Sequence, residues 1–174
     1  MTGLKSDDTF SVTGLFDLVV PLANGDGYGV RLTDRFTGSP FNIGNDHIQL
    51  FVIRNFSGVL GISLNAQDFS TGTSTALAFA ALDTGHAQIA LRLERASASS
   101  NDLTASYAYG DGGVLGDFVS FANHATIFHG EGYTRAGFMA FGLAPPIPEP
   151  QTYALMLAGL GLLGAATRHR RKRS

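Results

Sequence analysis

A strict alternation of apolar and polar side chains over residues 88–95 is the feature that most restricts what this chain can fold into. Ile89, Leu91 and Leu93 fall on one face of the segment, and the polar side chains between them fall on the other. A period of two residues is that of a β-strand with one face in a core and one face in water. The pattern therefore predicts a half-buried strand in an antiparallel sheet.

Similar patterns recur up to residue 143, with many β-branched and aromatic side chains and with Gly, Asn and Asp between the segments. None of these segments has the length and period of an ordinary helix. Besides 88–95, strands are predicted at residues 9–20, 28–34, 48–55, 60–66, 76–82, 103–108, 126–129 and 135–143. Many short strands joined by turns predict an all-β domain over residues 1–144, an antiparallel two-sheet sandwich of the jelly-roll kind.

The composition excludes several classes of function. The chain has no cysteine, which removes disulfides, thiol catalysis and cysteine-based zinc sites. Residues 1–147 carry seven Lys and Arg against thirteen Asp and Glu, a net charge of −6, whereas residues 148–174 carry +4. An acidic body without a basic stripe does not neutralise a phosphate backbone, so we expect no nucleic-acid binding.

The C-terminal tail falls into three segments of different composition. Residues 145–151 are rich in proline and predict a stiff spacer, because proline lacks an N–H and disfavours a helix. Residues 152–167 carry no charge and would span about 24 Å as a helix, at roughly 1.5 Å per residue. The basic segment 168–174 then holds five cationic side chains: Arg168, Arg170, Arg171, Lys172 and Arg173.

Two interpretations of residues 152–167 are open. An apolar run this short is commonly a buried core helix in a soluble protein. However, a core helix does not normally end in a block of cations. Basic residues that follow a membrane helix stay on the cytoplasmic side, and their long side chains snorkel to make up for a short span. We therefore predict a transmembrane helix over 152–167 and a basic cytoplasmic tail over 168–174, with the body on the outer side of the inner membrane.

Pro148, Glu149 and Pro150, followed by the apolar run and the terminal arginine cluster, resemble the PEP-CTERM sorting signal of Gram-negative bacteria. The resemblance implies that the protein is exported, is held transiently in the inner membrane by the tail helix, and is processed near the Pro-Glu-Pro motif by an exosortase. It also implies a final place at the cell surface or in the extracellular matrix, and an association with exopolysaccharide and biofilm. In that family the three residues are recognition residues rather than catalytic ones.

The start of the sequence departs from this expectation. An exported protein begins with a cationic segment and an apolar segment of roughly 7 to 15 residues, and residues 1–10 hold neither. The segment from Asp7 to Val12 already looks like the entry to the first strand. We therefore expect the true start, with its signal peptide, to lie upstream of Met1.

Residues 89–95, leading to 103–113, resemble the paired strands of concanavalin-like and laminin-G-like sandwiches. This resemblance implies the two-sheet architecture and no particular ligand. A retaining glycosidase of such a fold needs two carboxylates about 5 to 5.5 Å apart, which on one strand would read Glu-x-Asp or Glu-x-x-x-Glu. The body holds only Glu94 and Glu131 and no such pair, so we expect no enzyme activity.

A ligand rim for sugar is one interpretation of Tyr28, Tyr107, Tyr109 and Asp111. Each tyrosine lies close to a glycine–aspartate turn, and Tyr107 and Tyr109 share one face of a strand. The alternative is that the rings complete the core of the sandwich with their hydroxyl groups at its edge.

Calcium is the one cofactor that the loops suggest, with Asp26 and Asp111 as the candidate ligands. Hard cations need several converging oxygens. Asp-Gly and Asn-Gly pairs also form hairpin turns, which is the alternative interpretation. Without further zinc ligands beside them, His47, His86 and His124 are interpreted as turn or solvent side chains.

Two functions are compatible with these observations. The first, which we favour, is an exported, non-catalytic β-sandwich that acts by adhesion or by contact with exopolysaccharide. Its other partners are an exosortase and the inner membrane. The second is a secreted polysaccharide hydrolase of concanavalin-like fold. The missing carboxylate pair favours the first, because glycan binding tolerates its absence and a two-carboxylate hydrolase does not.

Overall fold

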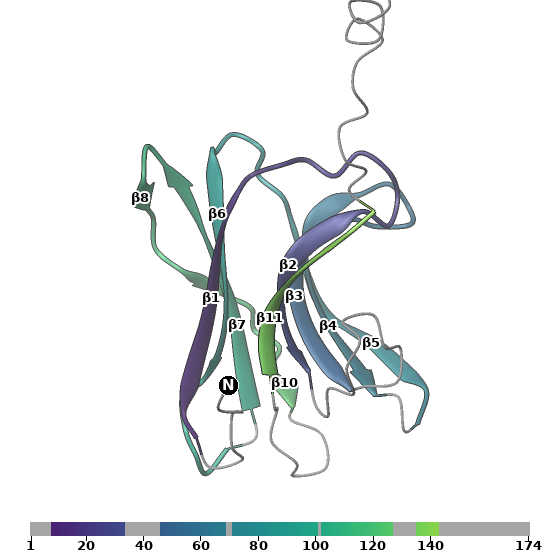
Figure 1. Ribbon diagram of the computed structural model, residues 1–174, viewed down its shortest axis with the longest axis vertical. Helices are drawn as coiled ribbons and strands as arrows, with labels where there is room; N and C mark the ends of the chain where they lie inside the picture. Colours follow the sequence, from purple (N-terminus) through teal and green to yellow (C-terminus); the bar gives the residue numbers. More distant parts are fainter. Residues whose placement is uncertain (1–7, 34–45, 69–70, 101, 127–134, 143–174) are drawn as a thin grey trace, which may run out of the picture. The chain divides into compact units, whose positions relative to one another are not determined.

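The computed structural model describes residues 8–33, 46–68, 71–100, 102–126 and 135–142, and throughout these residues the regular structure is β (Figure 1). The chain divides into two units, Met1–Leu143 and Ala144–Ser174, and every described residue belongs to the first. The strands of this unit form two antiparallel sheets, called sheet A and sheet B here.

Sheet A has β1 (Phe10–Asp17) at one edge. From that edge the order is β1, β6 (Gln88–Arg95), β7 (Asp102–Asp111) and β10 (Ala125–Thr126), and the short strands β8 (Val114–Leu115) and β9 (Val119–Ser120) also pair with β7. The first strand therefore pairs with a strand far along the chain, with Phe10 opposite Arg95.

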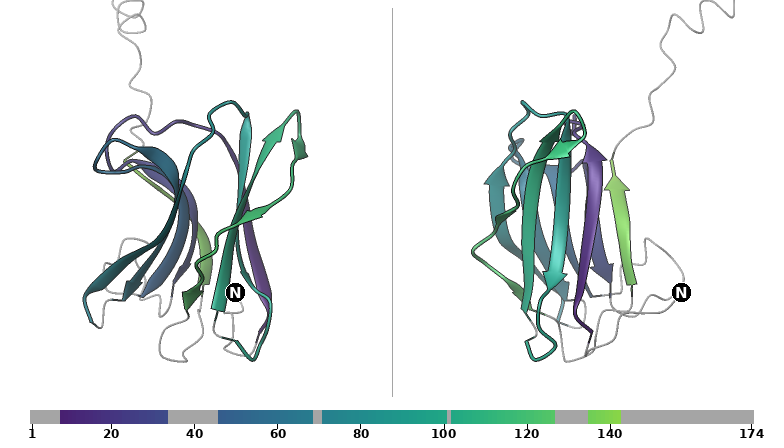
Figure 2. Two further views of the ribbon diagram at one scale, coloured as in Figure 1. Left: turned by 180° about the vertical axis from the view of Figure 1, so that it is seen from behind. Right: turned by 90° about the vertical axis from the view of Figure 1, so that its left-hand side faces the viewer.

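In sheet B, four consecutive strands form a meander, and the last strand of the domain pairs with the first of them at the edge of the sheet. Its order is β11 (Arg135–Phe141), β2 (Gly27–Thr33), β3 (His47–Arg54), β4 (Leu60–Asp68) and β5 (Thr73–Ala81). The ladder between β4 and β5 shifts register between Leu64 and Asn65. Figures 1 and 2 show that sheet B is bent, with its concave side facing away from sheet A.

The core lies between the two sheets and follows the two-residue period of the sequence. Sheet B contributes the alternate residues Tyr28, Val30, Leu32, Ile48, Leu50, Val52, Ile62, Leu64 and Ala66, and sheet A contributes Ile89, Leu91, Leu93, Leu103, Ala105 and Ala125. Burying these aliphatic side chains removes apolar surface from water, which is the main force that holds the two sheets together.

The predicted all-β fold with two antiparallel sheets is confirmed. Of the predicted strand 126–129, only the first residue is described, in β10. Among the described residues, no helix has the length and apolar character that a membrane span requires. The predicted spacer 145–151, transmembrane helix 152–167 and basic tail 168–174 lie outside the described residues.

Candidate functional site

Three of the four predicted rim residues come together at one end of sheet A, around a histidine. The ring of His86 stacks on the ring of Tyr109, with 4.8 Å between centroids, and its Nδ1 lies 2.6 Å from Oδ2 of Asp111. Tyr107 meets Tyr109 edge to face at 5.7 Å. The backbone N–H of Asp83 donates to the hydroxyl oxygen of Tyr109 at 2.8 Å. This His86 cluster ties the loop before β6 to the end of β7.

The tyrosines of the cluster point toward the core rather than toward an open platform. Tyr107 lies opposite Leu91 in the ladder, Tyr109 lies opposite Ile89, and both rings pack against the buried core. Burial raises the pKa of Tyr109, which is the strongest influence on that hydroxyl. The arrangement matches a ring that completes the core with its hydroxyl group at the edge.

The charges of His86 and Asp111 stabilise each other. The hydrogen bond to Asp111 raises the pKa of His86, and the same hydrogen bond, followed by the N–H of Ala87, lowers the pKa of Asp111. A second carboxylate, that of Asp83, lies 3.6 Å from Nε2 of His86. Sequence analysis missed His86 as a member of this site, because its partner Asp111 is far away in the sequence.

We expect His86→Gln to destabilise the domain most near pH 5. The stability that charged His86 contributes is complete below the ordinary histidine pKa of about 6.5 and is lost as pH rises through its raised folded pKa. The contribution of Asp111 is present above the ordinary aspartate pKa of about 3.9 and is lost as pH falls through its lowered folded pKa. Thermal unfolding of wild type and variant across pH 4 to 9 measures the difference in stability between them. This gap in stability should disappear on the alkaline side.

The matched control is His124→Gln, at an exposed histidine beside β10 whose Nδ1 lies 3.5 Å from Oγ1 of Thr104. This variant should follow wild type at every pH. A gap for His86→Gln that stays constant with pH would show that the ring acts by packing on Tyr109 alone.

Neither calcium candidate has its carboxylate directed only to solvent. Asp111 accepts from Ala87 N–H through Oδ1 at 2.9 Å and contacts His86 through Oδ2. Asp26 is buried, and its Oδ2 accepts from Ala23 N–H at 3.0 Å within the turn before β2. In the described part of the chain, no group of three or more His, Asp and Glu side chains is arranged to hold a metal.

The fourth predicted rim residue, Tyr28, lies apart from the other three, on sheet B. It is 5% exposed, and its hydroxyl oxygen accepts from Val19 N–H at 3.0 Å. Its ring contacts Phe16 at 5.4 Å. Tyr28 is therefore a core residue whose hydroxyl group holds the segment that follows β1.

A row of polar side chains crosses the concave face of sheet B. Arg31 on β2 lies opposite Gln49 on β3, and Gln49 lies opposite Asn65 on β4. Arg31 Nη2 lies 2.6 Å from Nδ1 of His47, in the next row. The Nε of Arg31 is buried and has no hydrogen-bond partner among the residues that the structure describes. This row was not predicted from the sequence, although all its members occupy the strand positions between core residues.

Aromatic rings occupy the adjoining part of the same face, above glycines of neighbouring strands. A Cβ on Gly29 would collide with the backbone of Leu50 and Phe51, and a Cβ on Gly61 would collide with the ring of Phe79. Phe51 is buried, whereas Phe79 is 45% exposed. The concave face therefore offers an exposed ring beside amide and guanidinium groups.

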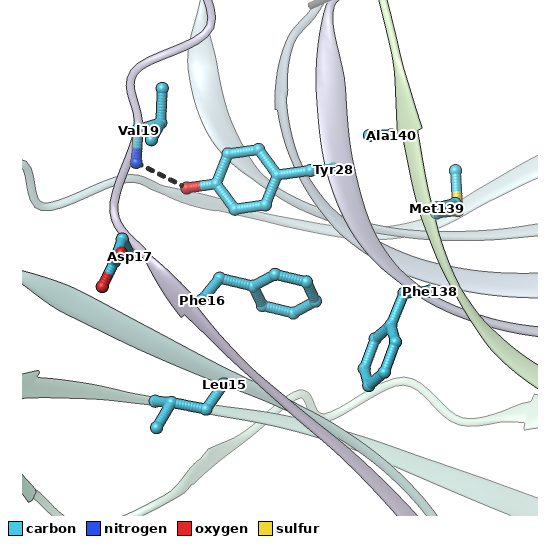
Figure 3. Close-up of a pocket in the computed structure, with 8 residues that line it drawn as sticks. All are labelled: Leu15, Phe16, Asp17, Val19, Tyr28, Phe138, Met139 and Ala140. Atoms are coloured by element: carbon cyan, nitrogen blue, oxygen red, sulfur yellow. Dashed lines mark hydrogen bonds between the residues drawn. The ribbon is translucent and has the colours of Figure 1, made fainter.

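An apolar groove of about 570 Å³ lies between the edge strands β1 and β11 (Figure 3). The ring of Phe16 lies between the rings of Tyr28 and Phe138, at 5.4 and 5.8 Å. The groove is also lined by Leu15, Asp17, Val19, Met139 and Ala140. The Asp17 carboxylate points away from the Phe16 ring, so the groove lacks converging polar groups.

Residues 146–172 match the PEP-CTERM protein-sorting motif. The chain carries a PEP-CTERM sorting signal. This motif marks an exported protein with a membrane-anchored sorting signal at its C-terminus and an exosortase as its processing partner. The predicted recognition residues Pro148, Glu149 and Pro150 lie within the matched segment, as do the cations of the basic tail up to Lys172, all outside the described residues.

Comparison of whole proteins adds little to the PEP-CTERM match. No curated protein matches the chain. Among solved structures, a mutant of the GH43 protein BlXynB from Bacillus licheniformis is similar, with 14% identity and a TM-score of 0.45. The similarity covers 75% of this chain and 23% of that chain. The two-sheet body is consistent with the concanavalin-like architecture that the sequence resembles.

Proposed function

We propose that this protein is a non-catalytic component of the bacterial envelope and extracellular matrix, released by an exosortase and bound to exopolysaccharide through the concave face of sheet B. The PEP-CTERM match at residues 146–172 carries the proposal, because it assigns export and processing to the chain. The resemblance to PEP-CTERM proteins implies contact with matrix polymers, which supports a binding surface with the chemistry of sugar recognition.

The concave face has that chemistry. Sugars present hydroxyl groups that both donate and accept hydrogen bonds, and the amides of Gln49 and Asn65 do the same. Arg31, which is partly exposed on the same face, adds a guanidinium group whose N–H groups donate only. The half-exposed ring of Phe79 supplies an apolar surface for the C–H face of a sugar ring. These groups come from four adjacent strands, so their spacing is held by the sheet.

Catalysis is not part of the proposal, because the carboxylates of Glu94, Asp83 and Asp111 contact other side chains. Glu94 lies 3.6 Å from Nε of Arg92. Asp83 and Asp111 contact opposite nitrogens of the His86 ring, so imidazole fills the space in which a hydrolase would hold water and a glycosidic bond. Secreted polysaccharide hydrolysis remains the alternative function.

Replacing Gln49 and Asn65 together by alanine should weaken the binding of the full chain to exopolysaccharide roughly thirtyfold, since each of two lost hydrogen bonds costs about 1 kcal/mol. Affinity electrophoresis in gels that contain polysaccharide from an exosortase-encoding bacterium measures the effect. The matched control is Gln88→Ala, which removes an amide that donates to Asp17 on sheet A. Equal retardation of all three proteins would refute the concave face as the binding surface. Release of reducing sugar ends by wild type would favour the hydrolase instead.

A further inference from the structure

Two loops at one end of the sandwich expose large apolar side chains. Leu22, in the loop between β1 and β2, is 87% exposed, and Phe56, in the hairpin between β3 and β4, is 86% exposed. Val59, in the same hairpin, is 50% exposed. We call Leu22, Phe56 and Val59 the apolar pole.

The apolar pole is rigidly built. The side-chain amide of Asn24 donates to the carbonyl of Phe56 at 3.2 Å, and Gly25 N–H donates to the carbonyl of Arg54 at 2.7 Å. Arg54 Nε in turn donates to the carbonyl of Pro21 at 2.9 Å. Gly25 has a positive φ of 91°, and the Phe56 ring lies so close that a Cβ there would meet it at 3.3 Å. These hydrogen bonds join the backbones of the two loops, and the Phe56 ring lies over Gly25.

The surface of the apolar pole carries no charge. Residues 18–25 and 55–61 contain no charged side chain. Of the charged residues next to these segments, Asp26 is buried and accepts from Ala23 N–H, and Arg54 donates to the carbonyls of Pro21 and Gly58. Asp17 is exposed at the end of β1, where its carboxylate accepts from the side-chain amide of Gln88 on sheet A. The charged side chains of the His86 cluster, at the same end, belong to sheet A and the loop before β6.

The chain leaves the sandwich beside the apolar pole (Figure 1). Phe141, the last residue of β11, lies opposite Gly27, and a Cβ on Gly142 would collide with the Asp26 side chain. The PEP-CTERM match begins at residue 146, and the uncharged run begins at 152. Nine residues separate 142 from 152, and the ten Cα-to-Cα steps between these two positions span at most about 35 Å when fully extended. A tail held in a bilayer therefore keeps this end of the domain close to the lipid surface.

We propose that the apolar pole inserts Leu22 and Phe56 into the interface of the membrane that holds the tail, and so orients the domain for processing. The tether raises the effective concentration of lipid at the pole, so two exposed side chains are enough for a contact that they do not make alone. Removal of their apolar surface from water favours the contact, and the absence of charge avoids a desolvation penalty. This inference rests on the membrane-anchored sorting signal that the PEP-CTERM match implies, before the release that the proposed function includes.

The chain has no tryptophan, so a single introduced indole reports on its own surroundings. The test uses the full chain with Phe56→Trp, reconstituted in phosphatidylcholine vesicles, with and without dibrominated lipid as a quencher. The matched control is Ala98→Trp, in the exposed loop after β6 at the opposite end of the sandwich. Tryptophan at position 56 should emit at shorter wavelength than in the absence of vesicles. Brominated lipid should quench it several-fold more than it quenches the control.

Flotation of the vesicles separates this inference from the anchor. Protein that floats while position 56 behaves like position 98 overturns the inference and leaves the anchor intact. Protein that neither floats nor is quenched overturns both. A shift to shorter wavelength without quenching by brominated lipid shows that another protein copy covers the apolar pole, which also overturns the lipid contact.

Discussion

Full-length protein should accumulate in cells that lack an exosortase, and a shorter product should replace it in cells that have one. With a signal peptide supplied, the two strains differ only in the enzyme that the PEP-CTERM motif at 146–172 implies. Cleavage near Pro148 removes a segment with a net charge of +4 from a body with a net charge of −6. The product should therefore be smaller by electrophoresis and more acidic by isoelectric focusing.

Proline substitutions distinguish recognition of the motif from general proteolysis of the spacer. Pro148→Ala alters the Pro-Glu-Pro motif, whereas Pro145→Ala makes the same chemical change just outside the matched segment. Pro148→Ala should leave most of the chain at full length in the strain with exosortase, and Pro145→Ala should be processed like wild type. Identical full-length bands in both strains would refute processing altogether.

Arg95→Met should lower the free energy of unfolding by about 3 kcal/mol, since three carbonyl groups lose the charged donor that this buried side chain supplies. Arg95 ends β6 and is 2% exposed. It donates to the carbonyls of Ser100 at 2.9 Å, Asp8 at 3.1 Å and Ala98 at 3.0 Å. One guanidinium thus joins the start of the first strand to the loop after β6. Urea unfolding of the full chain, followed by circular dichroism, measures the loss.

The control for this substitution is Arg92→Met on the same strand. Arg92 is partly exposed, donates to Ser106 Oγ at 3.1 Å and lies 3.9 Å from the centre of the Phe118 ring. Interactions of this kind at a surface contribute about 1 kcal/mol or less. Equal losses for the two variants would show that the buried hydrogen bonds of Arg95 contribute no more than surface contacts do.

The strands were predictable from the sequence because their period is local. Ile89, Leu91 and Leu93 enter the core in the predicted phase, and the same phase places Arg95 on the core face, although the sequence reading did not draw that conclusion. Burial of a charge depends on whether carbonyl groups from other loops reach it. For Arg95, the carbonyl groups of Asp8 and Ser100 reach the guanidinium group only in the folded domain. A local sequence pattern does not contain these contacts.

The candidate site was less predictable, since its residues meet only through the pairing of strands. Asp111 contacts His86 because the loop before β6 lies against the end of β7. The row of Arg31, Gln49 and Asn65 depends on the register of three strands, and the connection between β2 and β3 is too long to fix a register by turn geometry alone. The alternation of apolar and polar residues predicts on which face of its strand each residue lies. Which residues lie side by side in the row depends on how the strands pair.

Both sheets close through partners that are far apart in the sequence. In sheet A, the first strand pairs with β6, which comes much later in the chain. In sheet B, Gly27 pairs with Phe141, at the end of the domain. Folds dominated by such distant pairings fold slowly, because the entropy of closing a long loop is lost before the contacts form. A slow folder stays an extended polymer for longer after synthesis. For a chain with an export signal, this delay is time in which it can still be threaded across a membrane.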